Sequence, residues 1–168
     1  LRRQRQMCIR DRDNKDYSLF ESGAILMYLA EKSGKLLNFS DKDEYYRTIE
    51  WLMWQMGAVG PMFGQAHHFL YYNPGLSAYS EERYQNEVKR LYRLLNKKLE
   101  NFDYVSGPGK GEYSIADIAI WPWVSRYQRQ GISLNDYPEV YRWYKDIYQR
   151  PAVQKGYYGP NFESEIPT

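Results

Sequence analysis

Cysteine is nearly absent from this sequence, in which Cys8 is the only one among 168 residues. A single cysteine excludes an intramolecular disulfide framework and a cysteine-rich zinc site. A run of about 18 apolar residues is also lacking, so no segment has the character of a membrane span. We therefore expect a cytoplasmic protein without a membrane partner. Large rings are plentiful instead, with 18 Tyr and 5 Trp, and they predict a core and pockets built from aromatic side chains.

Basic residues do not outnumber acidic residues outside the first twelve positions. Those positions contain five arginines and one acid, whereas the rest of the chain holds 18 bases and 20 acids. The net charge of +2 therefore derives from one short segment. Because no basic face is expected elsewhere, nucleic acid is not a predicted partner.

Residues 1–12, with the sequence LRRQRQMCIRDR, show neither helical nor strand periodicity. They also lack the apolar centre of a signal peptide and the serine content of a transit peptide. The segment resembles translated sequencing-adapter scars at the ends of assembled environmental sequences, and we interpret it as non-native. The alternative is a genuine basic arm. Under the first interpretation the natural protein extends further at its N-terminus, and Cys8 is not one of its residues.

Residues 13–37 predict one strand followed by one helix. The strand-like run is Tyr17 to Phe20. In the helix over residues 23–33, Ser22 is a natural N-cap residue and Gly34 ends the helix. The apolar face of this helix consists of Ile25, Leu26 and Leu29.

The remainder, residues 38–168, predicts a bundle of helices. Apolar residues at steps of three and four indicate helices over about 41–69, 80–102 and 138–149. Pro61 lies inside the first of these patterns and predicts a kink there. The tail from Gly156 onward shows no regular pattern.

A further helix start is marked by Ser114 and Asp117, which have the spacing of a capping box with Asp in place of Glu or Gln. Tyr113 and Ile118 can form the hydrophobic staple that accompanies such a box. The cap alone stabilises a helix by about 1 kcal/mol. We expect Pro122 to distort the first turns. The glycine-rich stretch before this helix lacks the spacing of a phosphate loop and is interpreted as a connector.

The segment Phe20-Glu-Ser-Gly-Ala-Ile25 resembles the end of the thioredoxin-like half of a glutathione transferase. The helices that follow resemble the C-terminal domain of that family, including its capping-box helix at Ser114-Ile-Ala-Asp-Ile118. Further motifs are similar to the bacterial nu class, the glutathione-dependent disulfide-bond oxidoreductases. These motifs are Glu50-Trp-Leu-Met-Trp-Gln55, Gly60-Pro-Met-Phe-Gly-Gln65, His67-His-Phe69 and Glu82-Arg-Tyr84.

The resemblance covers about residues 17–153 and implies a mainly α fold. It predicts an all-helical C-terminal glutathione transferase domain over residues 38–168, preceded by the last strand and helix of a thioredoxin-like domain over residues 13–37. Glutathione is implied as the cosubstrate, with no metal. The residue that stabilises the glutathione sulfur in complete members cannot be placed in this chain, so we assign no catalytic residue.

Glu21 and Ser22 stand where family members bind the γ-glutamyl end of glutathione. A carboxylate can pair with the ammonium group of that end through a charge-assisted hydrogen bond. The serine hydroxyl, the free N–H groups and the positive dipole of a helix start can hold its carboxylate. On local sequence alone the competing interpretation is that Ser22 only caps its helix and that Glu21 is a solvated partner of the dipole.

Arg83 is expected in the first turn of its helix, where a cation opposes the dipole. In nu-class enzymes the arginine of this motif reaches the glutathione of the other subunit. The resemblance therefore implies a homodimer with Arg83 at the partner's ligand, and a solvated surface arginine is the alternative. His67 and His68 are adjacent, so their side chains diverge by about 100° on a helix and cannot share a metal ion. We expect packing or helix-end roles for both.

Two functions remain open for the parent protein. The first is an enzyme that reduces small disulfides or conjugates glutathione to electrophiles, for which no protein cysteine is needed. The second is a non-catalytic, glutathione-transferase-like helical module for interaction or regulation. We expect the chain as given to show little turnover, because the sulfur-stabilising region is missing. We also expect its helical part to fold alone and to expose an apolar face.

Overall fold

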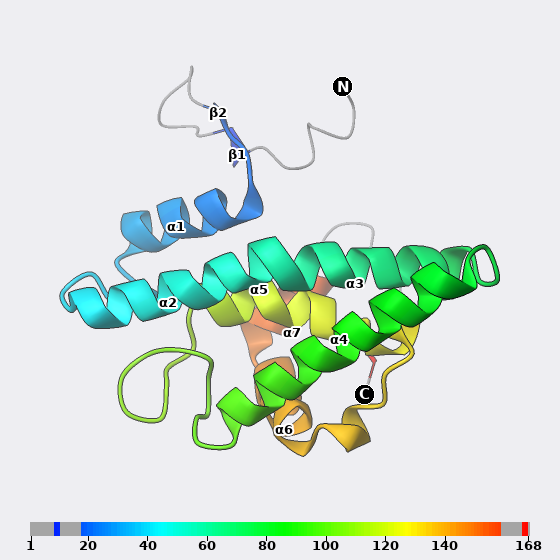
Figure 1. Ribbon diagram of the computed structural model, residues 1–168. Helices are drawn as coiled ribbons and strands as arrows, with labels where there is room; N and C mark the ends of the chain where they lie inside the picture. The colour runs from blue at the N-terminus through cyan, green and yellow to red at the C-terminus, as the bar shows by residue number, and fades with distance from the viewer. Residues whose placement is uncertain (1–8, 11–17, 159–165, 168) are drawn as a thin grey trace.

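The computed structural model describes residues 9–10, 18–158 and 166–167 (Figure 1). Cys8 and most of the segment 1–12 lie outside the described residues. The elements in chain order are β1 (Ile9–Arg10), β2 (Ser18–Leu19), α1 (Ser22–Ser33), α2 (Lys42–Trp54), the π-helix η2 (Gln55–Val59), α3 (Gly60–Ala66), the π-helix η3 (His67–Tyr72), α4 (Ala78–Leu99), α5 (Ile115–Val124), the 3-10 turns η4 (Tyr127–Gln130) and η5 (Leu134–Asp136), α6 (Pro138–Tyr148) and α7 (Pro151–Tyr157).

The two strands form one short antiparallel pair, with Ile9 opposite Leu19 and Arg10 opposite Ser18. The strand predicted within Tyr17 to Phe20 is therefore confirmed at β2. Residues 1–12 show no strand periodicity, and β1 within them is only two residues long, which is too short to show an alternating pattern. All other described elements are helical, which makes the architecture mainly α.

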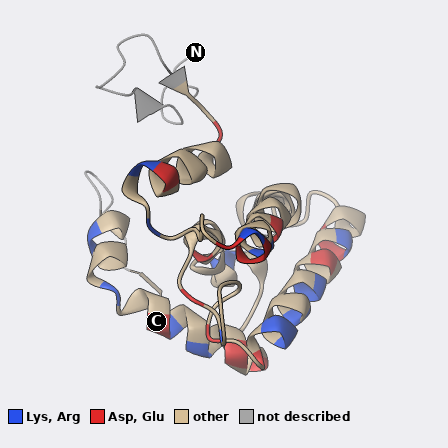
Figure 2. Cartoon of the chain, turned by 90° about the vertical axis from the view of Figure 1, so that its left-hand side faces the viewer, with Lys and Arg blue, Asp and Glu red and all other residues tan. Residues whose placement is uncertain are grey.

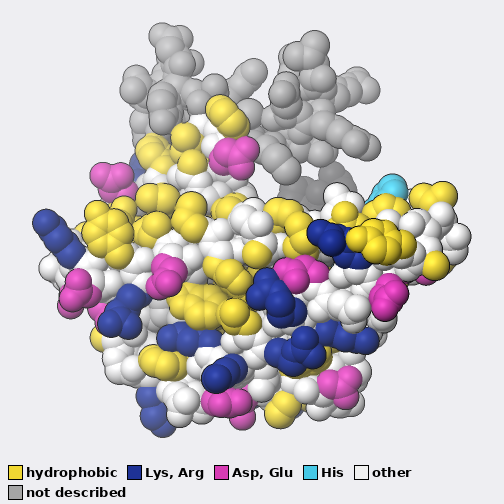
Figure 3. Space-filling model, viewed as in Figure 1, with side chains coloured by type: hydrophobic (Ala, Val, Ile, Leu, Met, Phe, Trp, Pro, Cys, Tyr) yellow, Lys and Arg dark blue, Asp and Glu magenta, His cyan; other side chains and the backbone are white. Residues whose placement is uncertain are grey.

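Helix α1 ends as predicted at Gly34, whose φ of 63° places it in the left-handed region, and whose N–H donates to the carbonyl of Ala30. The predicted apolar face is only partly buried. Small Gly23 and Ala30 are buried, whereas Leu29 is 43% exposed. Phe20, just before the helix, is 67% exposed as well. Apolar side chains are visible on the surface near α1 (Figure 3).

One unbroken helical rod is formed by α2, η2, α3 and η3 (Figure 1). Pro61 has no N–H to donate to the carbonyl of Gly57, and its ring would collide with that carbonyl in a regular α-helix. The backbone widens just before the proline instead, and the N–H of Gly60 donates to the carbonyl of Gln55, five residues back. The predicted distortion at Pro61 thus takes the form of a π turn.

Helix α5 occupies the centre of the bundle and is mostly apolar, as expected of a helix that is enclosed on most sides, although Pro122 is exposed. Its buried residues are Ile115, Ala116, Asp117, Ala119, Ile120, Trp121 and Val124. Contacts with α1, α2, η2 and α6 surround it. We had predicted that Pro122 would distort the first turns of this helix. It lies in the last turn instead, two residues before the helix ends at Val124.

The C-terminal region contains a helix that the sequence pattern did not predict. Helix α6 ends at Tyr148, close to the expected boundary. Pro151 then opens α7, since a proline at the first helical position loses no intrahelical hydrogen bond. At seven residues, α7 is too short to show a convincing apolar period.

Charged residues occur along most of the outer helices (Figure 2). Basic side chains gather over the second half of α4, where Lys89, Arg90, Arg93 and Lys97 are separated by no acidic residue (Figure 3). The expectation of no basic face beyond residue 12 was therefore wrong, because an overall charge balance does not show how charges are distributed. In the part of the chain that the structure describes, none of the helices has the length and apolar character to cross a bilayer.

Candidate functional site

Glu21 has an unusual backbone at the start of α1. Its φ of 71° and ψ of 118° put a residue with a Cβ in a region that costs on the order of 1–3 kcal/mol. Its carbonyl accepts the first helical hydrogen bond from the N–H of Ile25 at 2.9 Å. The side chain is exposed and makes no capping bond. The strained backbone therefore presents a carboxylate to solvent beside the start of a helix.

Ser22 is the first helical residue and not the N-cap, so the predicted capping role was wrong. Its hydroxyl instead donates to the sulfur of Met56 at 3.7 Å. A Cβ at Gly23 would lie 3.2 Å from the Cε of the same methionine. The start of α1 is thus seated on η2. No side chain among the described residues caps its first turn, so its early N–H groups remain available to an anion.

Arg83 lies on a different helix, and its predicted position was off by one turn. Helix α4 begins at Ala78, and Ser77 caps it by accepting a hydrogen bond from the N–H of Ser80 at 3.3 Å. Arg83 therefore lies in the second turn, beyond the strongest part of the dipole, and the dipole argument does not apply to it. It is exposed and, with Met62 of α3, lines a groove of about 490 Å³. No contact between described residues joins Arg83 to Glu21 or Ser22 within this chain.

The capping box at Ser114 and Asp117 is confirmed. The Oδ2 atom of Asp117 accepts from the N–H of Ser114 at 3.0 Å and from its hydroxyl at 2.9 Å. The Oδ1 atom accepts from the N–H of Val105 at 3.1 Å and from Nε1 of Trp143 at 2.9 Å. Burial raises the pKa of this carboxyl, and the four hydrogen bonds oppose that shift. The box therefore fastens α5 to the preceding loop and to α6.

His67 has the packing role expected of it. Its ring stacks on Trp123, and its Nε2 lies 3.2 Å from the amide nitrogen of Gln130. That amide also donates to the carbonyl of Trp123, while its oxygen accepts from the hydroxyl of buried Tyr92 at 2.8 Å. Burial, with help from Arg129 and Arg126, lowers the pKa of His67 to about 4. The ring is therefore neutral near pH 7 and can accept the amide hydrogen.

His68 is exposed and lies at the end of the rod. Its backbone carbonyl accepts hydrogen bonds from the N–H of Asn73 at 3.0 Å and from the side-chain amide of Asn73 at 3.1 Å. This is the helix-end role that we expected. In the described ranges, no group of three His, Cys, Asp or Glu side chains is arranged to hold a metal ion.

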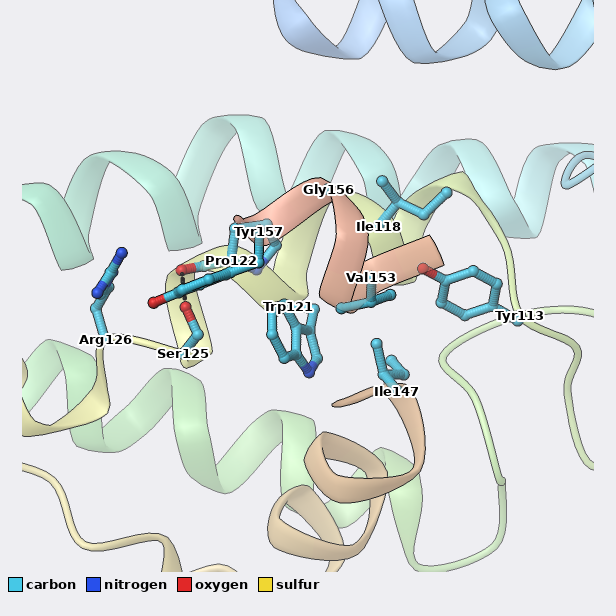
Figure 4. Close-up of a pocket in the computed structure, with 10 residues that line it drawn as sticks. All are labelled: Tyr113, Ile118, Trp121, Pro122, Ser125, Arg126, Ile147, Val153, Gly156 and Tyr157. Carbon is cyan, nitrogen blue, oxygen red and sulfur yellow. Dashed lines mark hydrogen bonds between the residues drawn. The ribbon is translucent and has the colours of Figure 1, made fainter. Parts of the chain in front are cut away.

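A pocket of about 410 Å³ lies between α5, the end of α6 and α7 (Figure 4). Its walls are mainly apolar and aromatic. They include Trp121, Ile147, Val153 and Tyr157, with Arg126 at one end. Sequence reasoning did not single out this pocket, because α7 was not predicted and because the spacing of these residues has no chemical signature.

The family follows from comparison with known proteins. The family model for the glutathione S-transferase, C-terminal domain, matches residues 59–151. That match covers more than half of the chain, which therefore belongs to the glutathione S-transferase family. The resemblance that the motifs implied is confirmed.

Three individual relatives show which members of the family this chain is similar to. The chain is 53% identical over 136 residues to the disulfide-bond oxidoreductase YfcG of Escherichia coli K12, covering 81% of this chain and 61% of that protein. A glutathione transferase from Pseudomonas putida, solved with one glutathione disulfide per subunit, matches with 45% identity and a TM-score of 0.77, over 86% of this chain and 64% of that one. A Burkholderia graminis glutathione transferase with two glutathione molecules per subunit matches with 38% identity and a TM-score of 0.79, over 90% and 65%. The chain thus spans somewhat less than two-thirds of the length of these relatives.

Proposed function

We propose that this chain is part of a glutathione-dependent disulfide-bond reductase that can also conjugate glutathione to electrophiles, and that Glu21 and Ser22 bind the γ-glutamyl end of glutathione. The observation that carries the proposal is the geometry at the start of α1. A strained residue there exposes a carboxylate beside uncapped N–H groups. The names of the relatives above support the same assignment.

The γ-glutamyl end carries one ammonium group and one carboxylate, which need opposite partners. The Glu21 carboxylate suits the ammonium group, since charge-assisted hydrogen bonds are about twice as strong as neutral ones. The N-terminal N–H groups of α1 and the Ser22 hydroxyl suit the carboxylate. In the ligand-free chain the Ser22 hydroxyl donates to the Met56 sulfur, a weak acceptor, so it exchanges that bond for one to the carboxylate when glutathione binds.

The proposed reaction is thiol–disulfide exchange between two glutathione molecules and a disulfide substrate. The thiolate of the first glutathione attacks one sulfur of the substrate, so that a mixed disulfide forms and one thiol leaves. The thiolate of the second attacks the glutathione sulfur of that mixed disulfide, which releases the other thiol and glutathione disulfide. Two glutathione thiols are oxidised and one substrate disulfide is reduced. No protein thiol takes part, in keeping with a sequence whose single cysteine is Cys8.

Two further parts of the proposal concern the parent protein. We place it in the cytoplasm, where a reducing glutathione pool supplies the thiol. We also propose a homodimer in which Arg83 reaches the glutathione of the other subunit, since its guanidinium is exposed at a groove. Light scattering of the full-length parent tests the dimer. The low turnover expected of this chain alone stays a prediction, tested with chlorodinitrobenzene and hydroxyethyl disulfide.

Calorimetric titration of the chain with glutathione tests the binding site. Glu21→Gln removes the charge and keeps the shape, so glutathione affinity should fall about tenfold or more, as expected for one lost charge-assisted hydrogen bond. Glu31→Gln, on an exposed residue near the other end of α1, changes the net charge equally and should leave the affinity unchanged. Equal affinities for the native chain and Glu21→Gln would remove Glu21 from the site. Glutathione binding by a full-length parent that shows no turnover would favour the non-catalytic module.

A further inference from the structure

The sulfur of Met56 lies at the proposed glutathione site, where α1 rests on the rod (Figure 1). It accepts the hydrogen bond from the hydroxyl of Ser22 at 3.7 Å, and this contact is exposed to solvent. The methionine side chain is partly buried. A small solute can therefore reach the sulfur atom while the rest of the side chain packs against the helix start.

Few other contacts between described residues hold the start of α1. Gly23 and Ala30 are the buried residues of this helix, and no described side chain caps its first turn. The three atoms that a Cβ at Gly23 would meet first all belong to Met56, with its Cε at 3.2 Å and its sulfur at 3.5 Å. A chemical change at this sulfur would therefore act directly on Ser22 and on the first N–H groups of the helix.

The thioether of methionine is oxidised by peroxide to a sulfoxide. The sulfur gives an electron pair to one oxygen of hydrogen peroxide, the O–O bond breaks, and the second oxygen leaves as water. The sulfur is thereby oxidised by two electrons and the peroxide is reduced by two. The side chain becomes polar, and its new oxygen accepts hydrogen bonds more strongly than the thioether, which is a weak acceptor.

We infer that Met56 is a peroxide-sensitive modification site and that its oxidation lowers the affinity for glutathione. The identification of the affected ligand as glutathione rests on the proposed function. The sulfoxide oxygen retains the Ser22 hydroxyl, which would otherwise bind the carboxylate of glutathione. It also needs room beside Gly23, where the methionine is already in contact, so the start of α1 is displaced from the rod.

The modification is reversible, as a regulatory change requires. A methionine sulfoxide reductase restores the thioether while a dithiol is oxidised to a disulfide and the sulfoxide oxygen leaves as water. Oxidation of Met56 would thus reduce glutathione binding under peroxide stress, and the reductase would restore it.

Peroxide treatment followed by calorimetric titration with glutathione tests the site, after mass spectrometry of peptides has measured the oxidation of Met56. The affinity of the oxidised native chain should fall about tenfold or more, as expected when a hydrogen bond to a charged group is lost. Met56→Leu keeps a similar apolar volume and cannot be oxidised, so the same treatment should leave its affinity unchanged. This variant also controls for oxidation of the other methionines and of Cys8. Met53→Leu removes a methionine that is 47% exposed in α2, and it should remain as sensitive as the native chain.

The native chain alone provides a further test. The reductase together with dithiothreitol should restore its affinity, whereas dithiothreitol alone should not. Equal affinities before and after oxidation of Met56, or an equal loss in treated Met56→Leu, would overturn the inference. A treatment that oxidises Met53 and leaves Met56 intact would overturn it as well.

Hydrogen exchange at the start of α1 needs no glutathione and separates this inference from the proposed function. The amides of residues 22–26 should exchange faster in the oxidised native chain and at an unchanged rate in treated Met56→Leu. A chain that shows this difference but does not bind glutathione would retain Met56 as the site that controls α1 and would contradict the proposed function. Unchanged exchange in such a chain would overturn the inference.

Discussion

Removal of the Asp117 carboxylate should be among the most destabilising single changes in this protein. The side chain is fully buried and accepts four hydrogen bonds, from Val105, from Trp143 and twice from Ser114. Hydrogen bonds to a charged group contribute about 1.5–3 kcal/mol each, and each buried donor left without a partner costs about 1–3 kcal/mol. The substitution also removes the desolvation cost of the buried carboxylate, which is several kcal/mol and offsets part of this loss. The net loss for Asp117→Ala should be about 5 kcal/mol, comparable with the whole stability of many domains.

The milder variant Asp117→Asn separates hydrogen bonding from shape. Its oxygen can keep the two bonds that Oδ1 accepts, but its NH₂ group would face the N–H and hydroxyl of Ser114. We therefore expect a loss of about 2–3 kcal/mol. The surface variant Asp146→Asn removes only an exposed pair with Arg142 at 3.6 Å and should cost less than about 1 kcal/mol.

Urea unfolding followed by circular dichroism measures these differences, with the slope m showing whether the transition stays two-state. The reasoning would be refuted if the free energy of unfolding of Asp117→Asn lay within about 0.5 kcal/mol of that of the native chain, because a loss this small is usual for surface substitutions. It would equally fail if Asp146→Asn cost as much. Either result would mean that the four hydrogen bonds do not fasten α5 to its surroundings.

Three further predictions concern other parts of the fold. Because the pKa of His67 is lowered to about 4 from 6.5, the unfolded chain binds the proton first. The free energy of unfolding should therefore fall as pH drops from 6.5 towards 4, by at most about 1.4 kcal/mol per pH unit. Urea unfolding repeated across that range measures this pH dependence, and the part due to His67 should be absent in His67→Gln. Ser77→Ala removes the cap of α4 and should lower the free energy of unfolding by about 1 kcal/mol; an unchanged urea midpoint would show that the cap is dispensable. Gly111→Ala would place a Cβ 2.6 Å from a backbone oxygen, whereas the Cβ of Gly109→Ala would meet nothing within 4 Å. Both glycines have a positive φ, so thermal unfolding should show a larger loss of stability for Gly111→Ala than for Gly109→Ala. Equal losses of stability would contradict the close approach at Gly111.

Much of the helical fold could be predicted from apolar periodicity and caps, because these signals are local. The stripe of α4 and the capping box at Ser114 and Asp117 are examples. The exact start of α4 could not be predicted, since Ser77 and Ser80 are both suitable caps and the choice depends on the chain before them. The π turns have no propensity signature that separates them from an α-helix.

The residues of the candidate site could be named from the sequence, but their conformation and contacts could not be predicted. Glu21 and Ser22 were singled out by the resemblance, but neither the positive φ of the first nor the contact of the second with Met56 has a local signal.

The π turn at Gln55–Val59 has a consequence for length changes in the rod. Each of its bonds spans one residue more than an α-helical bond, so the turn behaves as a one-residue insertion that the helix has absorbed. Deleting Gly57, whose position has open space around it, would let the backbone revert to ordinary α-helix. Because the π turn already absorbs this extra residue, the residues before and after the deletion would keep nearly the same orientation about the axis. Phe63 would still face Tyr92 of α4, whereas deleting one residue from the regular helix α2 would turn the rest of the rod by roughly 100°.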